Sequence, residues 1–450
     1  MLQVGQKFPP CFSSSFDVDS RQALPLRSRG GQGPGSHATP PFFGTPQRAW
    51  ARALPPPLAR RRLTSADLDA WARGPTVRGH AHSRPTFERY GLSLVREVGG
   101  GAAVPEDWAV RLLSATGAKG SEGPNQDAFS YTLLDSGWIV CVACDGHGEH
   151  GEVVAERVAR ALPLFLSPHL LEHDPEVALR RAFAEAQLDL ERCFRSAQVY
   201  SGAAVAACCV HSERREAWTA HAGDSQVVLG DLGGGGVVCY TEEHKAHDPG
   251  ELERLREAGA QVIQKRYDDG ELVSRIFIPR TGIPGLAMSR SLGDGCLKKY
   301  GVCADPEVQD MSTLWRACAA PVLLLASDGL WDMVTPGAAV EVLASRCRSG
   351  LDVLLGVEVL LRRSQRLWIE AEGDYCDDVT VLLVAPSASL AAATSCGRVH
   401  SAVVRGRARE PHGLWTSLRL QLGFSNVRRW SLQRLWNGAR MAKVSRLVEV

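Results

Sequence analysis

The chain has 450 residues, a hydrophobic content of 44% and a formal net charge of +1 at pH 7. This length fits one large domain with appended segments, and the composition is typical of a protein that buries a sizeable core. Because the net charge is close to zero, no nucleic-acid partner is expected. The sequence has no apolar run long enough to span a bilayer, and its N-terminus lacks the continuous apolar segment of a secretory signal.

The uneven spread of charge and composition predicts three parts. Residues 1–107 are interpreted as a mostly disordered extension, because the stretch before residue 64 is rich in Pro, Gly, Ser and Arg and has acidic residues only at Asp17 and Asp19. Residues 108–386 are predicted to form the folded domain. Residues 387–450 are predicted to form a basic tail.

Both extensions contain segments that are open to more than one interpretation. Ser65–Trp71 can make a short capped helix inside the N-terminal extension. Trp430–Arg446 can form a basic amphipathic helix, which would attach to a membrane surface or to a partner, or else pack on the folded domain. The Arg-rich start of the chain is compatible with a transit peptide or a localisation signal, and more simply with a solvated tail.

The 13 cysteines are odd in number and follow no disulfide framework. Many lie in apolar runs, as Cys208 and Cys209 do, which predicts buried, reduced thiols in a cytoplasmic and/or nuclear protein. Cys141 and Cys144 form a C-x-x-C pair, but such residues point to opposite faces of a strand. We therefore interpret them as core residues and not as zinc ligands.

Short apolar runs alternate with amphipathic stretches along the predicted domain. The predicted strands are Gly137–Cys144, Ala204–His211, Ala217–Ala222, Val227–Gly230, Val322–Ala326 and Val379–Val384. The predicted helices are Glu152–Leu164, Glu176–Ser196, Gly250–Ala258, Pro336–Arg346 and Val353–Glu370. Strands outnumber helices and several are joined by short turns, with Gly233–Gly236 as one hairpin connection or flexible loop. This pattern favours an antiparallel sandwich covered by helices over a parallel sheet.

Acidic residues stand at the ends of these apolar runs. They are Asp127, Asp145, Asp224, Asp328 and the pair Asp377 and Asp378. Any one of them alone is explained by a turn. Together, carboxylates that converge on one rim of a sheet repel each other and need a cation, and Mg²⁺ or Mn²⁺ suits a set of oxygen ligands. The pattern therefore indicates a metal site.

The chain also resembles a known family, the metal-dependent protein phosphatases of type 2C. The resemblance runs from about Lys119 to Val384. The matching segments, in the family's order, are NQDAF, CDGHG, AGDSQ, EEHKAHDPGELERLREAGAQV, GLAMSRSLGD, GVCADPEV, ASDGLWDMV and DDVTVLLV. Matches in order over most of the predicted domain make the resemblance specific.

The resemblance implies an α+β fold, an antiparallel β-sandwich flanked by α-helices on both faces in four layers (α-β-β-α). It also implies a site for two Mg²⁺ or Mn²⁺ ions at one end. Asp145 would bridge both ions, the Gly146 carbonyl would help to bind one, and Asp328 and Asp377 would hold the other. Asp127 would act nearby, Asp224 and Asp332 match positions that can hold a third ion, and His147 matches the general acid.

The implied reaction is hydrolysis of phosphoserine or phosphothreonine in proteins by water that the two ions activate. Phosphorylated proteins are the expected partners, and a monomer is expected. One alternative is a catalytically weak scaffold or binding protein with the same fold. Another is a hydrolase of small phosphoesters.

Four departures from the family's pattern bear on phosphate affinity and metal preference. Gln126 replaces a common Glu, and Gln can still accept a hydrogen bond from a metal-bound water. An upstream Arg that grips phosphate in many relatives is absent, and Lys119 is the candidate to replace it, as a point charge without a bidentate fork. Ala203 and Ala204 replace hydroxyl-bearing residues, and Asp378 replaces an Asn and adds a charge.

Overall fold

The computed structural model describes residues 62–83, 86–95, 104–119, 123–196, 199–234, 236–266 and 272–391. The predicted tail helix at 430–446, and most of both predicted extensions, lie outside these residues. Within them, no helix combines the length and the apolar character that crossing a membrane requires.

Two antiparallel sheets form the centre of the fold. One has the strand order β1-β4-β5-β6-β7-β14, with β13 also paired to β6, and the other has the order β2-β3-β16-β15-β8-β9. The strands of the first are β1 (Val77–His82), β4 (Asp127–Leu134), β5 (Trp138–His147), β6 (Gly202–His211), β7 (Glu216–Ala222), β13 (Leu292–Gly293) and β14 (Glu307–Asp310). Those of the second are β2 (Leu92–Val95), β3 (Trp108–Ala115), β8 (Gln226–Asp231), β9 (Gly236–Tyr240), β15 (Pro321–Ala326) and β16 (Val379–Pro386).

The central strands are largely apolar because both faces of each sheet are covered there. In β16, Leu382 and Val384 pack between the two sheets, whereas Val381 and Leu383 pack against the helices on the outer face. Successive side chains of a strand point to opposite faces, so a strand with two buried faces reads as a continuous apolar run. The hairpin from β8 to β9 spans the glycine run, as one of its two interpretations predicted.

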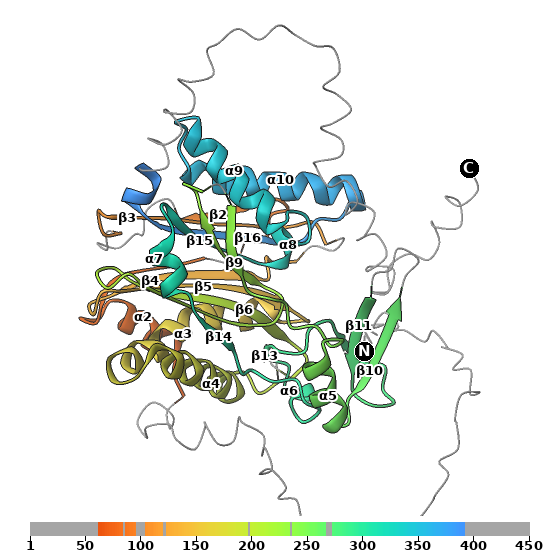
Figure 1. The fold of residues 1–450 in the computed structure, drawn as a ribbon. Helices are drawn as coiled ribbons and strands as arrows, with labels where there is room; N and C mark the ends of the chain where they lie inside the picture. The colour runs from red at the N-terminus through yellow and green to blue at the C-terminus, as the bar shows by residue number, and fades with distance from the viewer. Residues whose placement is uncertain are drawn as a thin grey trace, which may run out of the picture. The chain divides into compact units, whose positions relative to one another are not determined.

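Helices cover the outer face of each sheet, as Figure 1 shows. α3 (Gly151–Glu172) and α4 (Pro175–Cys193) pack on the first sheet, and α9 (Pro336–Arg348) and α10 (Leu354–Glu372) pack on the second. The short helices α7 (Ser312–Ala317) and α8 (Asp328–Trp331) precede and follow β15. The predicted four-layer α-β-β-α sandwich is confirmed.

Helix α3 runs beyond the end predicted at Leu164, to Glu172. Pro163 and Pro168 both lie inside this helix, and a proline inside a helix costs about 3 kcal/mol. The helix continues because Phe165, Leu166 and Leu170 are buried in the core that it shares with the first sheet. Burying a large apolar side chain contributes about 1.5–3 kcal/mol, so these three side chains together with Leu164 offset the cost of the two prolines.

A third, smaller antiparallel sheet was not predicted. It consists of β10 (Gln261–Arg266), β11 (Leu272–Phe277) and β12 (Pro284–Leu286), and it follows helix α5 (Pro249–Glu257). The short helix α6 (Gly295–Lys298) comes after it. Strand β10 is largely exposed, so its residues QVIQKR lack the apolar pattern by which a buried strand is recognised.

The fold begins before the domain boundary that was predicted at residue 108. Helix α2 (Ser65–Ala72) starts with the predicted cap, in which Thr64 and Asp67 exchange hydrogen bonds as a capping box. Strand β1 then pairs with β4, and β2 pairs with β3. Both are short edge strands: β1 has the mostly polar sequence VRGHAH, and β2 has only the four residues LSLV, which explains why composition alone placed them in the extension.

Candidate active site

Strand pairing brings the predicted acidic residues to one end of the sandwich. Asp127 opens β4 and lies directly opposite Asp145 of β5. In the second sheet, Asp328 follows the end of β15, and Asp377 stands two residues before the start of the neighbouring strand β16. Asp224 lies in the turn between β7 and β8.

Three of these carboxylates form the centre of the site. Oxygen atoms of Asp145, Asp224 and Asp328 all lie within 4.8 Å of one another. Oδ1 of Asp224 is buried and has no hydrogen-bond partner among the described residues. A buried oxygen without a donor is a costly arrangement that a bound cation would relieve.

The electrostatics of these carboxylates also fit cations. Burial, and then the charges of Asp328 and Asp127, raise the pKa of Asp145 well above its ordinary value. Burial, followed by the charges of Asp224 and Asp377, raises the pKa of Asp328 to about 6. Asp332 joins this acidic cluster, since burial and the charge of Asp328 raise its pKa as well. Carboxylates that resist ionisation side by side become favourable ligands once a divalent cation compensates their charge.

Asp127 is a buried member of the acidic cluster. The Ser327 hydroxyl donates a hydrogen bond of 2.7 Å to its Oδ2. Burial and the charge of Asp378 raise the pKa of Asp127 to about 8. Asp127 is thus a buried carboxyl directly opposite Asp145 at the acidic end of the sandwich.

Two lysines, one of which the sequence analysis had not singled out, neutralise part of the cluster. Nζ of Lys245 lies 2.9 Å from Oδ2 of Asp224 and 3.2 Å from Glu243. Burial alone would raise the pKa of Asp224, but the Lys245 ammonium lowers it below its ordinary value. The signal for Lys245 in the sequence was its place as the one cation in the motif EEHKAHD.

The other lysine is Lys119, the candidate for the missing phosphate-binding Arg. Its Nζ lies 2.8 Å from Oδ1 of Asp377 and 2.8 Å from Oδ2 of Asp378. A pair of backbone hydrogen bonds between Ala118 and Cys376 fixes this position. Lys119 therefore binds carboxylates of the site itself, and the extra charge of Asp378 has a cation beside it.

Asp378 holds three segments together. Its oxygens accept backbone hydrogen bonds from Gly117 at 2.7 Å and from Gln126 at 2.9 Å, in addition to the contact with Lys119. Its side chain is 2% exposed, which leaves it no room to face a substrate. The replacement of Asn by Asp at this position thus has a structural explanation.

Gly146 and Gln126 shape the turn that follows Asp145. A side chain at Gly146 would bring its Cβ within 2.4 Å of the carbonyl oxygens of Gln126 and Gly151, so only glycine fits. The Gln126 side chain donates a hydrogen bond of 2.8 Å to the carbonyl of Gly148. This amide group is therefore engaged in holding the DGHG turn.

His147 has a carboxylate partner that the sequence analysis missed. Its Nε2 lies 2.8 Å from Oδ2 of Asp294, and Ser291 donates a 2.5 Å hydrogen bond to the same oxygen. Burial alone would lower the pKa of His147, but the charge and hydrogen bond of Asp294 raise it above its ordinary value. Asp294 ends the motif GLAMSRSLGD, so the matching segment contained the signal but did not reveal the pairing.

The comparisons with known proteins agree with this geometry. The family model described as "Protein phosphatase 2C" matches residues 125–362. The chain is 34% identical over 299 residues to "Probable protein phosphatase 2C 64" of Oryza sativa subsp. japonica, which covers 63% of this chain and 68% of that protein. It is 31% identical over 251 residues to "Probable protein phosphatase 2C 61" of Arabidopsis thaliana, covering 53% of this chain and 74% of that protein.

A solved structure shows the same fold. The crystal structure of serine-threonine phosphatase 2C from Toxoplasma gondii superimposes with a TM-score of 0.53 at 19% identity, covering 66% of this chain and 99% of that one. The family match, the relatives, the fold and the acidic cluster lead to one conclusion. The chain belongs to the protein phosphatase 2C family of metal-dependent protein serine/threonine phosphatases.

Proposed function

We propose that the chain hydrolyses phosphoserine and phosphothreonine in protein substrates with two divalent cations at the Asp145 end of the sandwich. The observation that carries this proposal is the group of oxygens from Asp145, Asp224 and Asp328 within 4.8 Å of one another, one of them buried without a partner among the described residues. The ligand atoms are all oxygens, which favours Mg²⁺ or Mn²⁺ over zinc.

In this proposal each acidic residue has a distinct role. Asp145 would bridge two cations, the Gly146 carbonyl would complete one site, and Asp328 and Asp377 would complete the other. Asp127 would act beside them, directly or through water. Asp224 would hold a third cation more loosely, because that cation has to compete with the Lys245 ammonium 2.9 Å away.

The chemistry divides between the cations and the protein. When bound, the cations would activate a water molecule for attack on phosphorus and offset the charge of the phosphoryl oxygens. The leaving serine or threonine oxygen needs a proton, and the imidazolium of His147 would donate it. The Asp294 carboxylate holds the imidazole in place and favours its protonated form.

The proposal also covers the cellular compartment and the oligomeric state of the enzyme. All of the cysteines in the described part of the chain are free thiols, in accord with the predicted reducing compartment, the cytoplasm and/or the nucleus. We further propose that the catalytic domain acts as a monomer on phosphorylated proteins.

The test compares substrates and metals on the purified full chain. We expect phosphate release from a phosphothreonine peptide in Mn²⁺ or Mg²⁺, none in chelator, and slower turnover of a small aryl phosphate. Faster turnover of the aryl phosphate would favour a hydrolase of small phosphoesters. Folded protein that binds phosphopeptides without releasing phosphate would favour the scaffold function, with the arrangement of Lys119 as the first feature to examine.

A further inference from the structure

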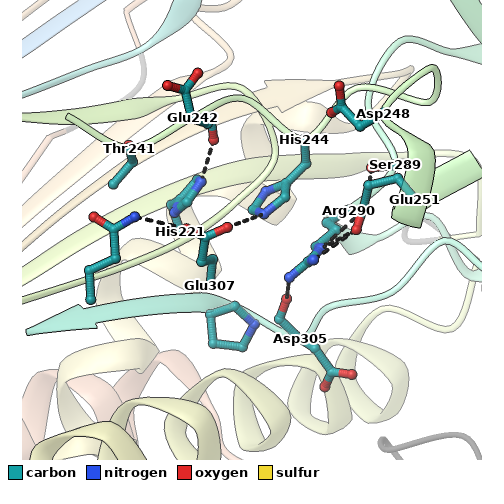
Figure 2. A network of polar contacts seen from close by, with 12 residues as sticks. His221, Thr241, Glu242, His244, Asp248, Glu251, Ser289, Arg290, Asp305 and Glu307 are labelled. Carbon is teal, nitrogen blue, oxygen red and sulfur yellow. Dashed lines mark hydrogen bonds and ion pairs between the residues drawn. The ribbon is translucent and has the colours of Figure 1, made fainter.

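The structure contains a second cluster of potential metal ligands, separate from the acidic cluster. It consists of His221 of β7, His244 in the segment after β9, and Glu307 of β14, and we refer to it as the histidine cluster (Figure 2). His221 and Glu307 are direct cross-strand partners. One ligand atom from each of the three residues lies within 4.8 Å of the other two.

The two histidines are buried and under-satisfied. His221 is fully buried and His244 is 4% exposed. Nδ1 of His221 and Nε2 of His244 are buried without a hydrogen-bond partner among the described residues. Nε2 of His244 is 3.6 Å from Oε2 of Glu307, which is beyond hydrogen-bond distance. Two orphaned ring nitrogens beside one carboxylate need an explanation.

His221 already has the protonation state of a metal ligand. Its Nε2 lies 2.6 Å from the carbonyl oxygen of Glu242, and because a carbonyl only accepts, Nε2 carries the proton. The lone pair is therefore on Nδ1, the ring nitrogen that has no hydrogen-bond partner among the described residues. Burial and the neighbouring His244 lower the pKa of His221 to about 4, so the ring is neutral at pH 7. Metal-ligating histidines usually donate their second nitrogen to a carbonyl or carboxylate in this way.

Glu307 is oriented for the same purpose. Gln309 donates a 2.8 Å hydrogen bond to its Oε1, while Oε2 faces His244. The nearby guanidinium of Arg290 is engaged by Glu251 at 2.7 Å and does not pair with Glu307 (Figure 2). The cluster thus combines two imidazoles with one negative charge that has no guanidinium partner among the described residues.

We infer that the histidine cluster binds one borderline transition-metal cation of the Zn²⁺ class, separate from the cations of the acidic cluster. Two imidazole nitrogens and a carboxylate oxygen are ligands that suit zinc and that Mg²⁺ does not prefer. Ligand atoms about 3.3 Å apart are required when zinc bonds are about 2.0–2.1 Å long and tetrahedral. The His244–Glu307 separation of 3.6 Å is close to that value, and the other separations, which are at most 4.8 Å, have to shorten when the cation binds.

Binding would turn the ring of His244. The two rings are stacked, with centroids 4.3 Å apart and planes 18° from parallel, so their lone pairs do not converge as they stand. Nδ1 of His244 now accepts the backbone N–H of Gly223 at 3.2 Å, which places the ring proton on Nε2. Coordination through Nε2 moves that proton to Nδ1 and breaks the bond to Gly223.

This movement links the histidine cluster to the acidic cluster. Gly223 immediately precedes Asp224, and His244 immediately precedes Lys245, which pairs with Asp224. A cation on the histidine cluster would therefore disturb the Asp224–Lys245 pair through the backbone that links Gly223 to Asp224 and His244 to Lys245. Zinc occupancy would act on the proposed third-cation position without touching Asp145 or Asp328.

The test measures Zn²⁺ binding to the purified full chain by competition with a chromophoric chelator in excess Mg²⁺. Glu307→Gln and His221→Asn each remove one ligand, and Glu307 is partly exposed, so its variant keeps the fold. His169→Asn is the matched control, because His169 is also buried beside a glutamate, at 3.0 Å, with an orphaned Nδ1 in the described chain but outside any three-ligand group identified there.

We expect both ligand variants to lose about one tight Zn²⁺ per chain, or to bind it at least about tenfold more weakly, and the control to match the wild type. The amide resonance of Gly223 should shift on Zn²⁺ addition in the wild type and in the His169→Asn control. It should not shift in either ligand variant. Equal stoichiometry and affinity in all four proteins would overturn the inference. Because the readout is binding, that result is independent of whether the chain hydrolyses phosphopeptides.

Discussion

Nε2 of His147 and Oδ2 of Asp294 lie 2.8 Å apart, and this contact joins the last residue of β5 to the residue before α6. Two residues far apart in the sequence thereby form a hydrogen-bonded His–Asp pair beside the acidic cluster. The carboxylate raises the pKa of the imidazole against the opposing effect of burial. The proposed general acid is thus protonated over a wider pH range than an ordinary histidine.

The first prediction concerns the pH profile of Asp294→Asn. Activity that needs protonated His147 is present below the raised pKa and is lost as pH rises through it. Removing the Asp294 charge lowers that pKa, so the alkaline decline of kcat should move to lower pH by about one unit or more. Ser291→Ala, which removes only a hydrogen bond to Asp294, should move the decline less. An unchanged alkaline limb in Asp294→Asn would contradict the assignment of His147.

The second prediction uses a glycine beside the same pair. A Cβ at Gly202 would lie 2.2 Å from Oδ2 of Asp294 and 2.7 Å from Nε2 of His147. Gly202→Ala should therefore force the two groups apart and reduce kcat by about 100-fold, the usual cost of misplacing a catalytic group by about 1 Å. Gly250→Ala is the control, because no atom lies within 4 Å of its added Cβ. Equal activity of the two variants would count against this geometry.

The third prediction concerns metal-free stability and pH. The pKa values of Asp328 and Asp127, about 6 and about 8 in the fold, exceed those of an unfolded chain. The native state then binds more protons than the unfolded state, so stability in chelator should fall as pH rises from about 4 to 8. Mg²⁺ should raise the Tm more at pH 8 than at pH 5. Thermal unfolding with Mg²⁺ and with chelator checks this, and equal Tm shifts at both pH values would refute it.

The fourth prediction tests Lys119. Its ammonium lies between Asp377 and Asp378, so Lys119→Met leaves two carboxylates without their shared cation. Breaking such a partly buried pair should cost about 3 kcal/mol in chelator, measured by denaturant unfolding. Saturating Mg²⁺ should recover part of this loss by compensating Asp377. Lys119→Arg keeps the charge and should cost less, and an equal loss in both variants would point to packing and not to charge.

The sequence predicted the features that depend on neighbouring residues in the chain, namely the buried strands and the acidic residues at their ends. The apolar run before Asp145 and the run after Asp378 have two buried faces, and the acidic residue at the end of each marks where the strand meets the site. Long apolar runs interrupted by a charge admit few other arrangements. The pattern therefore predicted an antiparallel sandwich covered by helices with an acidic edge, and the family resemblance added the four-layer order.

Features that depend on tertiary contacts were not within reach. Asp294 pairs with His147 across 147 positions of the chain, and no local pattern connects the two. The edge strand β1 takes its place from pairing with β4 and has the mostly polar sequence VRGHAH. The end predicted at Leu164 was too early because burial of the following apolar residues extends α3 to Glu172. In each case the deciding energy comes from a partner far away in the chain.

The sharpest test of the proposed two-metal site is phosphate release from a phosphothreonine peptide, compared between the wild type and Asp145→Asn in saturating Mn²⁺. Asp145 is the carboxylate shared by the proposed cation sites, and the variant keeps its size while removing its charge. The account predicts metal-dependent release by the wild type and a loss of about 100-fold or more in the variant, with an unchanged fold by circular dichroism. Equal release by the two folded proteins would contradict it.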